Sequence, residues 1–307
     1  MTNTRYTLTA ISANGQPDAF APLHKALRAL SATTLEVRVL PVPRSLAGRR
    51  SAQSYSLPAD YDIDLLARSL RELDLEASLD WAIQTVTSRV RPYRLAVFDM
   101  DSTLIQCEVI DELARVAGVG AQVAAITNRA MRGELDFQES FIERVALLKG
   151  LELNAVDRIL EVMPITEGVS ELLLTLRARG VYTAILSGGF LPFAQYLQRK
   201  FGFDEVHANG LDSDGGVLTG KVQAPIVDGD YKRKALLDIA ERKNIALEDT
   251  IAVGDGANDL PMLMTAGLGV AYAAKPLVQA QVDLQLNHVG LDGVLYYLGA
   301  SSELNDA

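Results

Sequence analysis

Two aspartates and two hydroxyl residues stand together in the stretch VFDMDSTL, residues 97–104. Asp99 and Asp101 follow the apolar run LAVF directly, and Ser102 and Thr103 come next. Burying a carboxylate without a partner is costly, so a cation must compensate these groups if they lie at the end of a buried strand. Taken alone, the pair could equally be an Asx turn that ends a strand.

Polar groups also follow other apolar runs of the chain. The run VYTAIL ends on Ser187-Gly188-Gly189, and the run TIAV ends on GDGAND, which supplies Asp255 and Asp259. The segment DGDYK, just upstream of a helix predicted over 232–243, supplies Lys232. Ligands bind beyond the carboxyl ends of strands in open parallel sheets, so these groups are expected at one site.

The chemistry that these groups suit is phosphoryl transfer. Asp99 and Asp255, with Asp259 as a further candidate, offer the hard oxygen ligands that Mg²⁺ prefers. A carboxylate can be the nucleophile, and a second carboxyl can protonate the leaving oxygen and later deprotonate water. The Ser187 hydroxyl, the amides around Gly188 and the Lys232 ammonium would stabilise charge on the phosphate oxygens.

The elements that must position these groups alternate between apolar strands and amphipathic helices. Strands are predicted at 94–99, 181–187, 203–207, 250–254 and 268–272. Near-continuous apolar strands separated by helices favour a parallel sheet covered on both faces. Two insertions are also expected, a helical one at 107–165 and a β-hairpin at 212–223 around the turn signal DGG.

The first 90 residues form a separate unit with the order β-α-β-β-α-β, which is the ferredoxin-like pattern. Its predicted strands are 6–12, 33–42, 51–57 and 79–86, and its predicted helices are 17–30 and 62–74. A basic, proline-containing linker is expected at 88–94, and a frayed tail at the last eight residues.

Four motifs in this order resemble those of the haloacid dehalogenase-like hydrolases: DMDST at 99–103, LSGG at 186–189, Lys232, and GDGANDLPML at 254–263. The resemblance covers about residues 93–290 and is closest to members that hydrolyse O-phospho-L-serine. It implies an α/β fold, with a Rossmann-like core over 93–300 and a helical cap at about 107–165. The preceding unit, 1–88, resembles an ACT-type regulatory domain in shape only.

The same resemblance implies a mechanism with Mg²⁺ as cofactor. Asp99 would be the nucleophile that forms an aspartyl-phosphate, and Asp101 the acid and base. The metal would be held by Asp99, the backbone carbonyl of Asp101 and Asp255, while Asp259 would hold the metal shell or Lys232. The implied reaction releases L-serine and phosphate from phosphoserine, the last step of serine biosynthesis.

Substrate-binding residues are also implied. Glu108 would bind the amino group, Arg144 the carboxylate, and Met131 and Phe137 would close over the ligand. The remaining implied contacts to substrate come from Ser187, Gly188, Gly189, Lys232 and Asn258. A buried substrate needs a route in, so the cap 107–165 is expected to open and shut on the core.

Two alternatives stay open on the residues alone. The same site could transfer its phosphoryl group to another hydroxyl amino acid, such as homoserine. In the other alternative, the N-terminal unit is a non-catalytic amino-acid sensor and the catalytic half is vestigial. Lys232 is also not distinguished by its own context, because it lies in the basic run with Arg233 and Lys234.

Composition limits the remaining classes of function. The 307-residue chain has a net charge of −10, which disfavours sequence-independent nucleic-acid binding. It has one cysteine, Cys107, no signal-peptide pattern and no apolar run of membrane-spanning length, so a cytoplasmic protein without membrane contact is expected. Exposed strand edges in a ferredoxin-like unit commonly pair, which favours a homodimer through the N-terminal unit.

Overall fold

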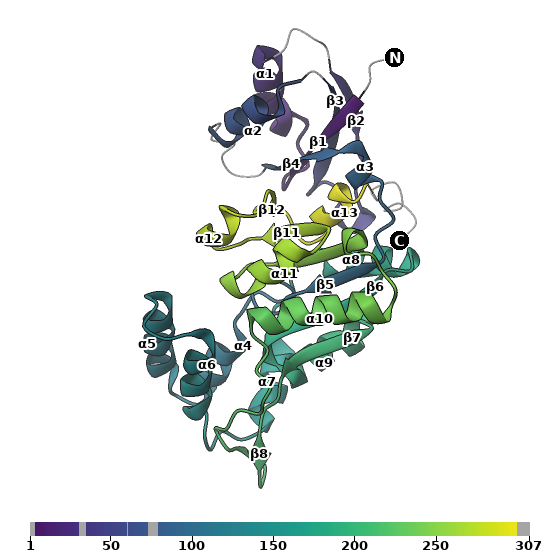
Figure 1. Cartoon of the computed structure of the whole chain (residues 1–307). Coiled ribbons are helices and arrows are strands. Elements are labelled where there is room, and N and C mark those ends of the chain that lie inside the picture. The colour runs from purple at the N-terminus through teal and green to yellow at the C-terminus, as the bar shows by residue number, and fades with distance from the viewer. Residues whose placement is uncertain (1–3, 31–34, 60, 73–78, 300–307) are drawn as a thin grey trace. The chain divides into compact units, whose positions relative to one another are not determined.

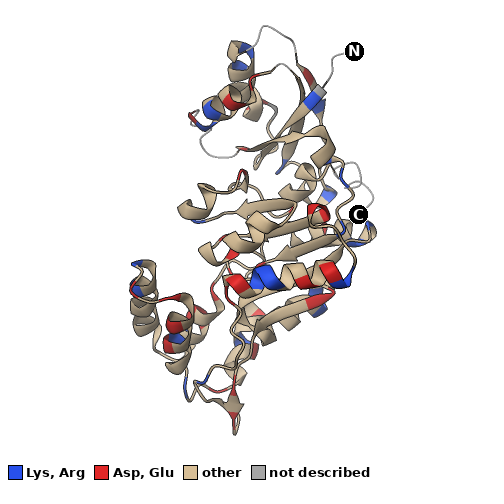
Figure 2. Cartoon of the chain, viewed as in Figure 1, with Lys and Arg blue, Asp and Glu red and all other residues tan. Residues whose placement is uncertain are grey.

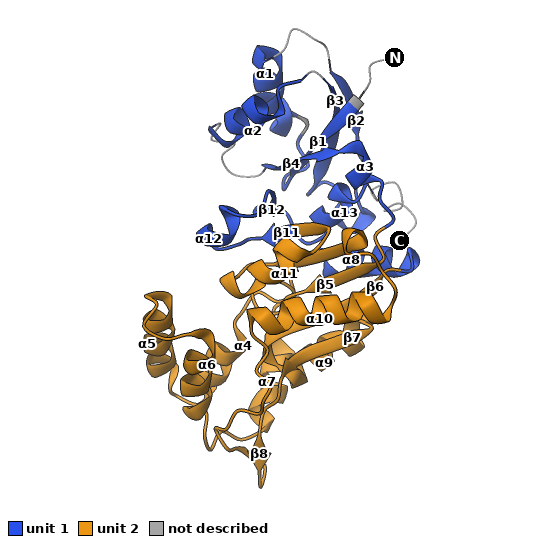
Figure 3. Ribbon diagram, in the orientation of Figure 1, with its two compact units in different colours: residues 1–92, 167–180, 270–307 blue, residues 93–166, 181–269 orange. Residues whose placement is uncertain are grey.

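The computed structural model describes residues 4–30, 35–59, 61–72 and 79–299 (Figure 1). The chain divides into two compact units that both draw on segments distant in sequence (Figure 3). Unit 1 comprises residues 1–92, 167–180 and 270–307, and unit 2 comprises residues 93–166 and 181–269. The predicted C-terminal tail lies outside the described residues.

The N-terminal part of unit 1 is a four-stranded antiparallel sheet with two α-helices. Its elements are β1 (Thr4–Ser12), η1 (Pro17–Phe20), α1 (Ala21–Leu30), β2 (Glu36–Val39), η2 (Arg44–Leu46), β3 (Ser51–Pro58), α2 (Ile63–Glu72) and β4 (Leu79–Thr85). The strands lie in the order β2-β3-β1-β4, so the predicted β-α-β-β-α-β succession is confirmed. The predicted start of the second strand and the end of the second helix fall on residues outside those described.

One face of this sheet and the two helices share an apolar core. Alternating residues of β1, including Leu8 and Ala10, face the same side as Tyr55 of β3 because successive strand residues point to opposite faces. Leu23 of α1 and Leu66 of α2 are fully buried against them. The period-2 and period-3.6 patterns of the sequence therefore meet in one core.

The rest of unit 1 comprises the short helix after β4, one helix from the middle of the chain and C-terminal segments. Its elements are α3 (Val86–Arg89), α8 (Val169–Ala178), β11 (Leu268–Tyr272), α12 (Pro276–Gln279), β12 (Leu284–Leu286) and α13 (Gly293–Tyr297). Strands β11 and β12 pair in parallel, α13 packs against β1, and β12 packs against β4. Buried Asp80 of β4 accepts hydrogen bonds from the backbone amides of Asn287, His288 and Val289.

Unit 2 contains four parallel strands in the order β10-β5-β6-β7. Its core elements are β5 (Leu95–Phe98), β6 (Tyr182–Phe190), α9 (Leu191–Phe201), β7 (Glu205–Asn209), α10 (Gly229–Arg242), η3 (Leu247–Asp249), β10 (Thr250–Gly254), η4 (Ala257–Asp259) and α11 (Leu260–Thr265). All four residues of β5 are buried, as expected for a central strand of a parallel sheet. Figure 2 shows residues of both charge signs interspersed along α10.

Two insertions extend this core. The first contains the helices α4 (Val109–Val116), α5 (Gly120–Met131), α6 (Phe137–Ala146) and α7 (Asn154–Val162). The second is the hairpin of β8 (Ser213–Asp214) and β9 (Val217–Leu218). Both were predicted, the hairpin from its glycine turn.

Several predicted boundaries were wrong, each for a local reason. The strand predicted at 203–207 begins two residues later, at Glu205, and the Asp204 side chain just before it accepts from the Thr183 amide and hydroxyl. The helix that carries Lys232 begins earlier, at Gly229, because the Asp228 side chain caps it by accepting from the Tyr231 amide. Strand β6 runs on through the predicted Ser-Gly-Gly end, with an irregular register after Leu186.

Two further differences are small. The predicted linker at 88–94 begins inside the short helix α3, which Thr85 caps by accepting from the Ser88 amide. Strand β12, with only three residues, was not predicted. Among the residues that the structure describes, no helix combines the length and the apolar character needed to cross a membrane.

Candidate active site

The candidate residues lie where the parallel strands of unit 2 end. Asp99 follows β5 directly, Ser187 lies near the end of β6, and Asp255 follows β10. Lys232 lies on the first turns of α10, and Asp259 ends the short helix η4. The carboxyl ends of neighbouring parallel strands share one edge, so the fold brings these residues together.

Lys232 forms the centre of this group. Its side chain is fully buried, and Nζ donates to Asp99 Oδ1 and to Asp259 Oδ1, each at 2.6 Å. Burial alone would lower the pKa of Lys232, but the two carboxylates raise that pKa above its ordinary value. The lysine therefore stays charged, and it is oriented by two buried acids.

Asp259 also shapes the loop that carries Asp255. Its second oxygen, Oδ2, accepts from the amides of Asp255 at 3.1 Å and Gly256 at 2.9 Å. A Cβ on Gly254 would lie 2.6 Å from Asp259 Cγ, so only glycine lets the strand pass this close. In the string GDGAND, the backbone of Gly254, Asp255 and Gly256 therefore packs closely against the Asp259 carboxylate.

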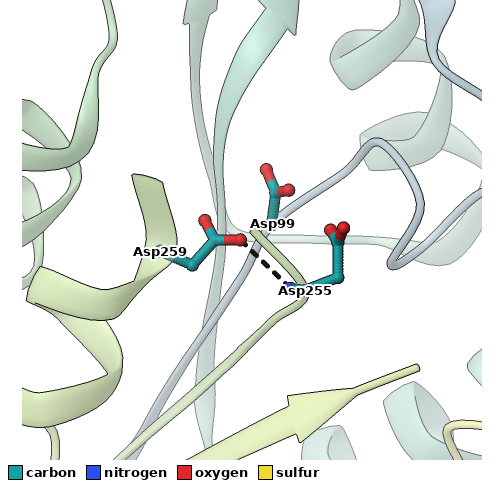
Figure 4. A group of neighbouring side chains, drawn as sticks. All are labelled: Asp99, Asp255 and Asp259. Atoms are coloured by element: carbon teal, nitrogen blue, oxygen red, sulfur yellow. Dashed lines mark hydrogen bonds between the residues drawn. The ribbon is translucent and has the colours of Figure 1, made fainter. Parts of the chain in front are cut away.

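Three carboxylates lie close to one another at this edge of the sheet (Figure 4). Asp99, Asp255 and Asp259 are all buried, and one oxygen of each lies within 4.8 Å of the others. Burial and the neighbouring Asp259 raise the pKa of Asp99 well above its ordinary value, although Lys232 opposes the shift. One lysine does not balance three acids, and an all-oxygen set of this kind fits a hard divalent cation such as Mg²⁺.

Asp101 lies against the end of β6. A Cβ on Gly189 would collide with Asp101 Oδ2 and lie 2.7 Å from Met100 Cε, so glycine lets this carboxyl approach the strand. Asp101 Oδ1 accepts from the Val109 amide at 3.3 Å. Burial, then Glu108 and Asp99, raise the pKa of Asp101 well above its ordinary value, which favours its protonated form.

Ser187 and its glycines form the irregular end of β6 beside Asp101. The fully buried Ser187 Oγ accepts from the Gly189 amide at 2.9 Å, and Asn209 Nδ2 donates to the Gly188 carbonyl at 2.8 Å. Asn209 in turn accepts from the Val227 amide at 2.9 Å. Sequence analysis missed Asn209, because no local pattern distinguishes it from a polar strand end.

Glu108 and Arg144 approach the site from the cap. Ser102 Oγ donates to Glu108 Oε1 at 2.9 Å, and Arg144 Nε donates to the Ser140 carbonyl at 3.2 Å. Burial lowers the pKa of Arg144, while Glu108, Asp111 and Asp101 act in the opposite direction. The guanidinium therefore lies in the field of the acids around the first motif.

The structure also assigns contacts to residues whose roles the sequence left unclear. Thr103 Oγ1 donates to Asp255 Oδ1 at 3.2 Å, which links the first motif to the last. Ser102 has a φ of 57°, a left-handed conformation unusual for a residue with a side chain. Asp111, which the sequence did not single out, is near enough to Arg144 to oppose the lowering of its pKa by burial.

The apolar cap residues and Asn258 lie in different settings. Phe137 Cζ would be 3.0 Å from a Cβ on Gly188, so this ring covers the end of β6 beside Ser187. Met131 is 77% exposed and does not cover the site in this conformation. A Cβ added to Gly256 would collide with Asn258 Oδ1. The side-chain amide of Asn258 therefore lies against the backbone of the last motif.

Comparison with known proteins agrees with this geometry. Residues 96–264, more than half of the chain, match the family model described as haloacid dehalogenase-like hydrolase. The chain is 45% identical over 233 residues to phosphoserine phosphatase SerB2 of Mycobacterium tuberculosis, a match that spans 76% of this chain and 57% of that relative. It is 45% identical over 224 residues to the phosphoserine phosphatase of Vibrio cholerae, covering 73% of this chain and 68% of that relative.

A solved structure extends the similarity to the N-terminal part. The unliganded probable phosphoserine phosphatase of Vibrio cholerae superposes with a TM-score of 0.79 at 34% identity, covering 99% of this chain and 90% of that one. The family match contains every candidate site residue from Asp99 to Asp259.

Proposed function

The chain belongs to the haloacid dehalogenase-like hydrolases, and from that premise we propose that it is a Mg²⁺-dependent phosphatase that hydrolyses O-phospho-L-serine to L-serine and phosphate. The observation that carries the proposal is the buried cluster in which Lys232 bridges Asp99 and Asp259 at 2.6 Å each. A surplus of buried carboxylates around one fixed cation suits a divalent metal and a phosphate dianion together.

The reaction proceeds through two displacements at phosphorus. A carboxylate oxygen of Asp99 forms a bond to phosphorus as the bond to the serine oxygen breaks, and Asp101 gives its proton to that leaving oxygen. Asp101 then takes a proton from water, which attacks phosphorus and releases phosphate and free Asp99. The raised pKa of Asp101 supports its starting role as the acid.

The metal would be held by Asp99, Asp255 and the backbone carbonyl of Asp101. When bound, it would neutralise carboxylate charge and draw the phosphate toward Asp99. The Thr103 hydroxyl on Asp255 and the Lys232 ammonium on Asp259 hold neighbouring groups in place, which supports a preformed site.

The substrate class follows from the two groups that reach the site from the cap. Glu108 would pair with the ammonium of the substrate, and the Arg144 guanidinium with its carboxylate. Both are supported by the electrostatic proximity of Arg144 to Glu108 and by the names of the relatives, which are phosphoserine phosphatases. Ser187, the amides of Gly188 and Gly189, Lys232 and Asn258 would bind the phosphate oxygens.

We propose that the N-terminal part is a separate regulatory domain. The sheet order β2-β3-β1-β4 with two helices supports an ACT-type regulatory domain over 1–88, followed by a catalytic domain over 93–300 with its cap at 107–165. Strand β2 is exposed along its whole length, which supports pairing of its edge in a homodimer.

The test is phosphate release from a panel of phosphorylated metabolites with and without Mg²⁺. We expect O-phospho-L-serine to be turned over fastest, and only with the metal. Analysis of products in the presence of homoserine separates hydrolysis from transfer, because transfer yields a phosphorylated acceptor in place of free phosphate. Serine binding with no turnover at any Mg²⁺ concentration would contradict the proposal and favour the sensor.

A further inference from the structure

The hairpin of β8 and β9 is a compact element with its own internal bonds. Its turn residues, Gly215 and Gly216, have φ values of 58° and 84°, which suit a two-residue hairpin turn. At its base, Asp212 accepts from Thr219 Oγ1 at 2.6 Å and from Gln223 Nε2 at 3.0 Å. These bonds give the hairpin a fixed shape, so that it can hold a neighbouring segment in place.

This hairpin pairs with the loop between α6 and α7 of the cap. The Gly150 amide donates to the Leu218 carbonyl at 2.8 Å, and the Leu218 amide donates to the Leu151 carbonyl at 2.8 Å. The Leu153 amide donates to the Gly216 carbonyl at 3.0 Å, and Glu152 lies opposite Val217 in an antiparallel bridge. Backbone from the cap and backbone from the core thus form one short ladder.

The end of the hairpin segment also touches helix α6 itself. A Cβ on Gly220 would lie 3.0 Å from both the Ala146 carbonyl oxygen and Lys149 Cβ. Ala146 is the last residue of α6, and Arg144 lies two residues before it. The hairpin therefore fixes the end of the helix that carries the proposed carboxylate-binding residue.

The other end of α6 is attached to the core as well. Gln138 Nε2 donates to Asp228 Oδ2 at 2.6 Å, and Asp228 is the residue that caps α10. The rings of Phe141 and Phe190 lie 5.7 Å apart, and Phe190 ends strand β6. Helix α6 is therefore held at both ends. Its rotation or withdrawal would break the backbone bonds to the hairpin, the contact between Phe141 and Phe190 and the hydrogen bond from Gln138 to Asp228.

Helix α5 is held much less firmly. Val123 is its only buried side chain, and Met131 at its end is 77% exposed. Its ion pair to α6, Arg129 with Glu143 at 2.8 Å, joins two side chains that are each 42% exposed, and such pairs contribute little.

We infer that the hairpin 212–223 positions Arg144 by holding the C-terminal end of α6, and that the cap opens through α5 while α6 stays attached to the core. The inference rests on the proposed function, because it assigns Arg144 to the substrate carboxylate. It also makes the hypothesis that the cap 107–165 opens and shuts on the core more specific, because only part of the cap would move.

A disulfide across the ladder tests the attachment directly. In the variant Glu152→Cys with Val217→Cys, the two cysteines face each other in an antiparallel bridge, a geometry that a disulfide can span. We expect the oxidised double variant to keep a kcat within about twofold of its reduced form, because α6 does not leave the hairpin during turnover. The two single variants, which also keep Cys107, control for other thiol chemistry.

Turnover that is lost on oxidation and restored by a reductant would overturn the inference in favour of a cap that moves as a whole. Failure of the pair to form a disulfide under mild oxidation would overturn the ladder itself. The experiment also runs with p-nitrophenyl phosphate, so it stays decisive if O-phospho-L-serine proves not to be a substrate and the proposed function fails.

A matched pair of glycine variants tests the positioning of Arg144. In Gly220→Ala the added Cβ would press against the end of α6. Gly215→Ala is the control: both glycines have a positive φ, 75° at Gly220 and 58° at Gly215, so both variants strain the backbone, but no atom lies within 4 Å of a Cβ added at Gly215. We expect Gly220→Ala to raise KM for O-phospho-L-serine about tenfold with little change in kcat, since a small displacement weakens a bidentate contact strongly.

Turnover of O-phosphoethanolamine, which lacks the carboxylate, should be unaffected by Gly220→Ala, and Gly215→Ala should leave both substrates unchanged. An equal loss on both substrates, or no loss on either, would contradict a positioning role for the hairpin.

Discussion

Unit 2 and unit 1 each bury a cluster of charged side chains, and the two clusters are built differently. In unit 2, Lys232 faces the buried acids Asp99 and Asp259, with Asp255 beside them. In unit 1, Arg50 donates from Nε and Nη2 to the two oxygens of Asp292 at 3.0 and 2.8 Å, and both side chains are at most 2% exposed.

The difference lies in the balance of charge. The Arg50–Asp292 pair is one cation on one anion with bidentate geometry, and the half-exposed Glu167 adds a second acid that remains partly in water. The unit 2 cluster has three buried acids for one lysine, so it carries a cost that only an added cation or a proton can remove. Surplus buried charge indicates a site that binds something, and a matched pair indicates a structural contact.

The largest expected effect comes from removing one of the three buried acids of the unit 2 cluster. Asp99→Asn should lower kcat at least about 10³-fold, because an amide cannot act as the nucleophile. The same change should leave the thermal midpoint without metal unchanged or higher, because it removes one unbalanced buried charge. Phosphate release measures kcat, and thermal unfolding measures the midpoint. The variant Asp283→Asn, which changes an exposed acid, is the control for both. Full activity in Asp99→Asn would contradict the assignment of Asp99 as the nucleophile.

The second effect is the opposite case, in which a balanced cluster loses one partner. Arg50→Ala leaves the fully buried Asp292 without its cation and should destabilise the protein by about 3–5 kcal/mol, with kcat of the folded enzyme unchanged. Arg49→Ala is the matched control: its side chain is 63% exposed and pairs with Glu167 at 2.7 Å, so its loss should cost below about 1 kcal/mol. Equal urea midpoints for the two variants would contradict this account.

The two clusters also differ in how far the sequence could locate them. The acids of unit 2 each follow an apolar strand, so a general rule about parallel sheets brings them together before any coordinates are known. The Arg50–Asp292 pair joins residues 242 positions apart through packing within unit 1, and neither residue has a local pattern that names the other. Contacts of that kind depend on tertiary structure that periodicity does not encode.

Helical spacing distinguishes Lys232 from its basic neighbours. The order of motifs favoured it over Arg233 and Lys234, but helical spacing gives the physical reason. Lys232, Leu236 and Ile239 recur at i, i+4 and i+7 on the buried face of α10, while Arg233 and Lys234 are exposed. The cap residue Asp228 would have set the start of this helix, and the buried face with it.

The pH dependence of the free energy of unfolding reports on the Arg50–Asp292 pair. Burial, together with Glu167 and Glu171, raises the pKa of Asp292 to about 6, although Arg50 opposes the shift. The folded state therefore binds a proton more tightly than the unfolded chain between about pH 4 and pH 6, and the free energy of unfolding should fall as the pH rises through that window. The fall from this group is at most about 3 kcal/mol.

Because other acids titrate in the same window, the measurement is the difference in slope between the wild type and Asp292→Asn, from urea unfolding at several pH values. The variant should lose the fall attributed to Asp292. Parallel pH profiles for the two proteins would show that Arg50 keeps this carboxyl at an ordinary pKa.

The smallest expected effect is the gain in stability when Mg²⁺ balances the unit 2 cluster. A ligand that binds only the folded state at a hundred times its Kd raises the free energy of unfolding by about 2.7 kcal/mol. Asp255→Asn removes one proposed ligand and should need more Mg²⁺ for the same rise in thermal midpoint, whereas Asp283→Asn, whose side chain is 95% exposed, should respond like the wild type. The readout is stability rather than turnover, so it tests the charge argument even if the substrate is misassigned; a thermal midpoint that Mg²⁺ leaves unchanged would mean that protons, not a metal, balance the buried acids.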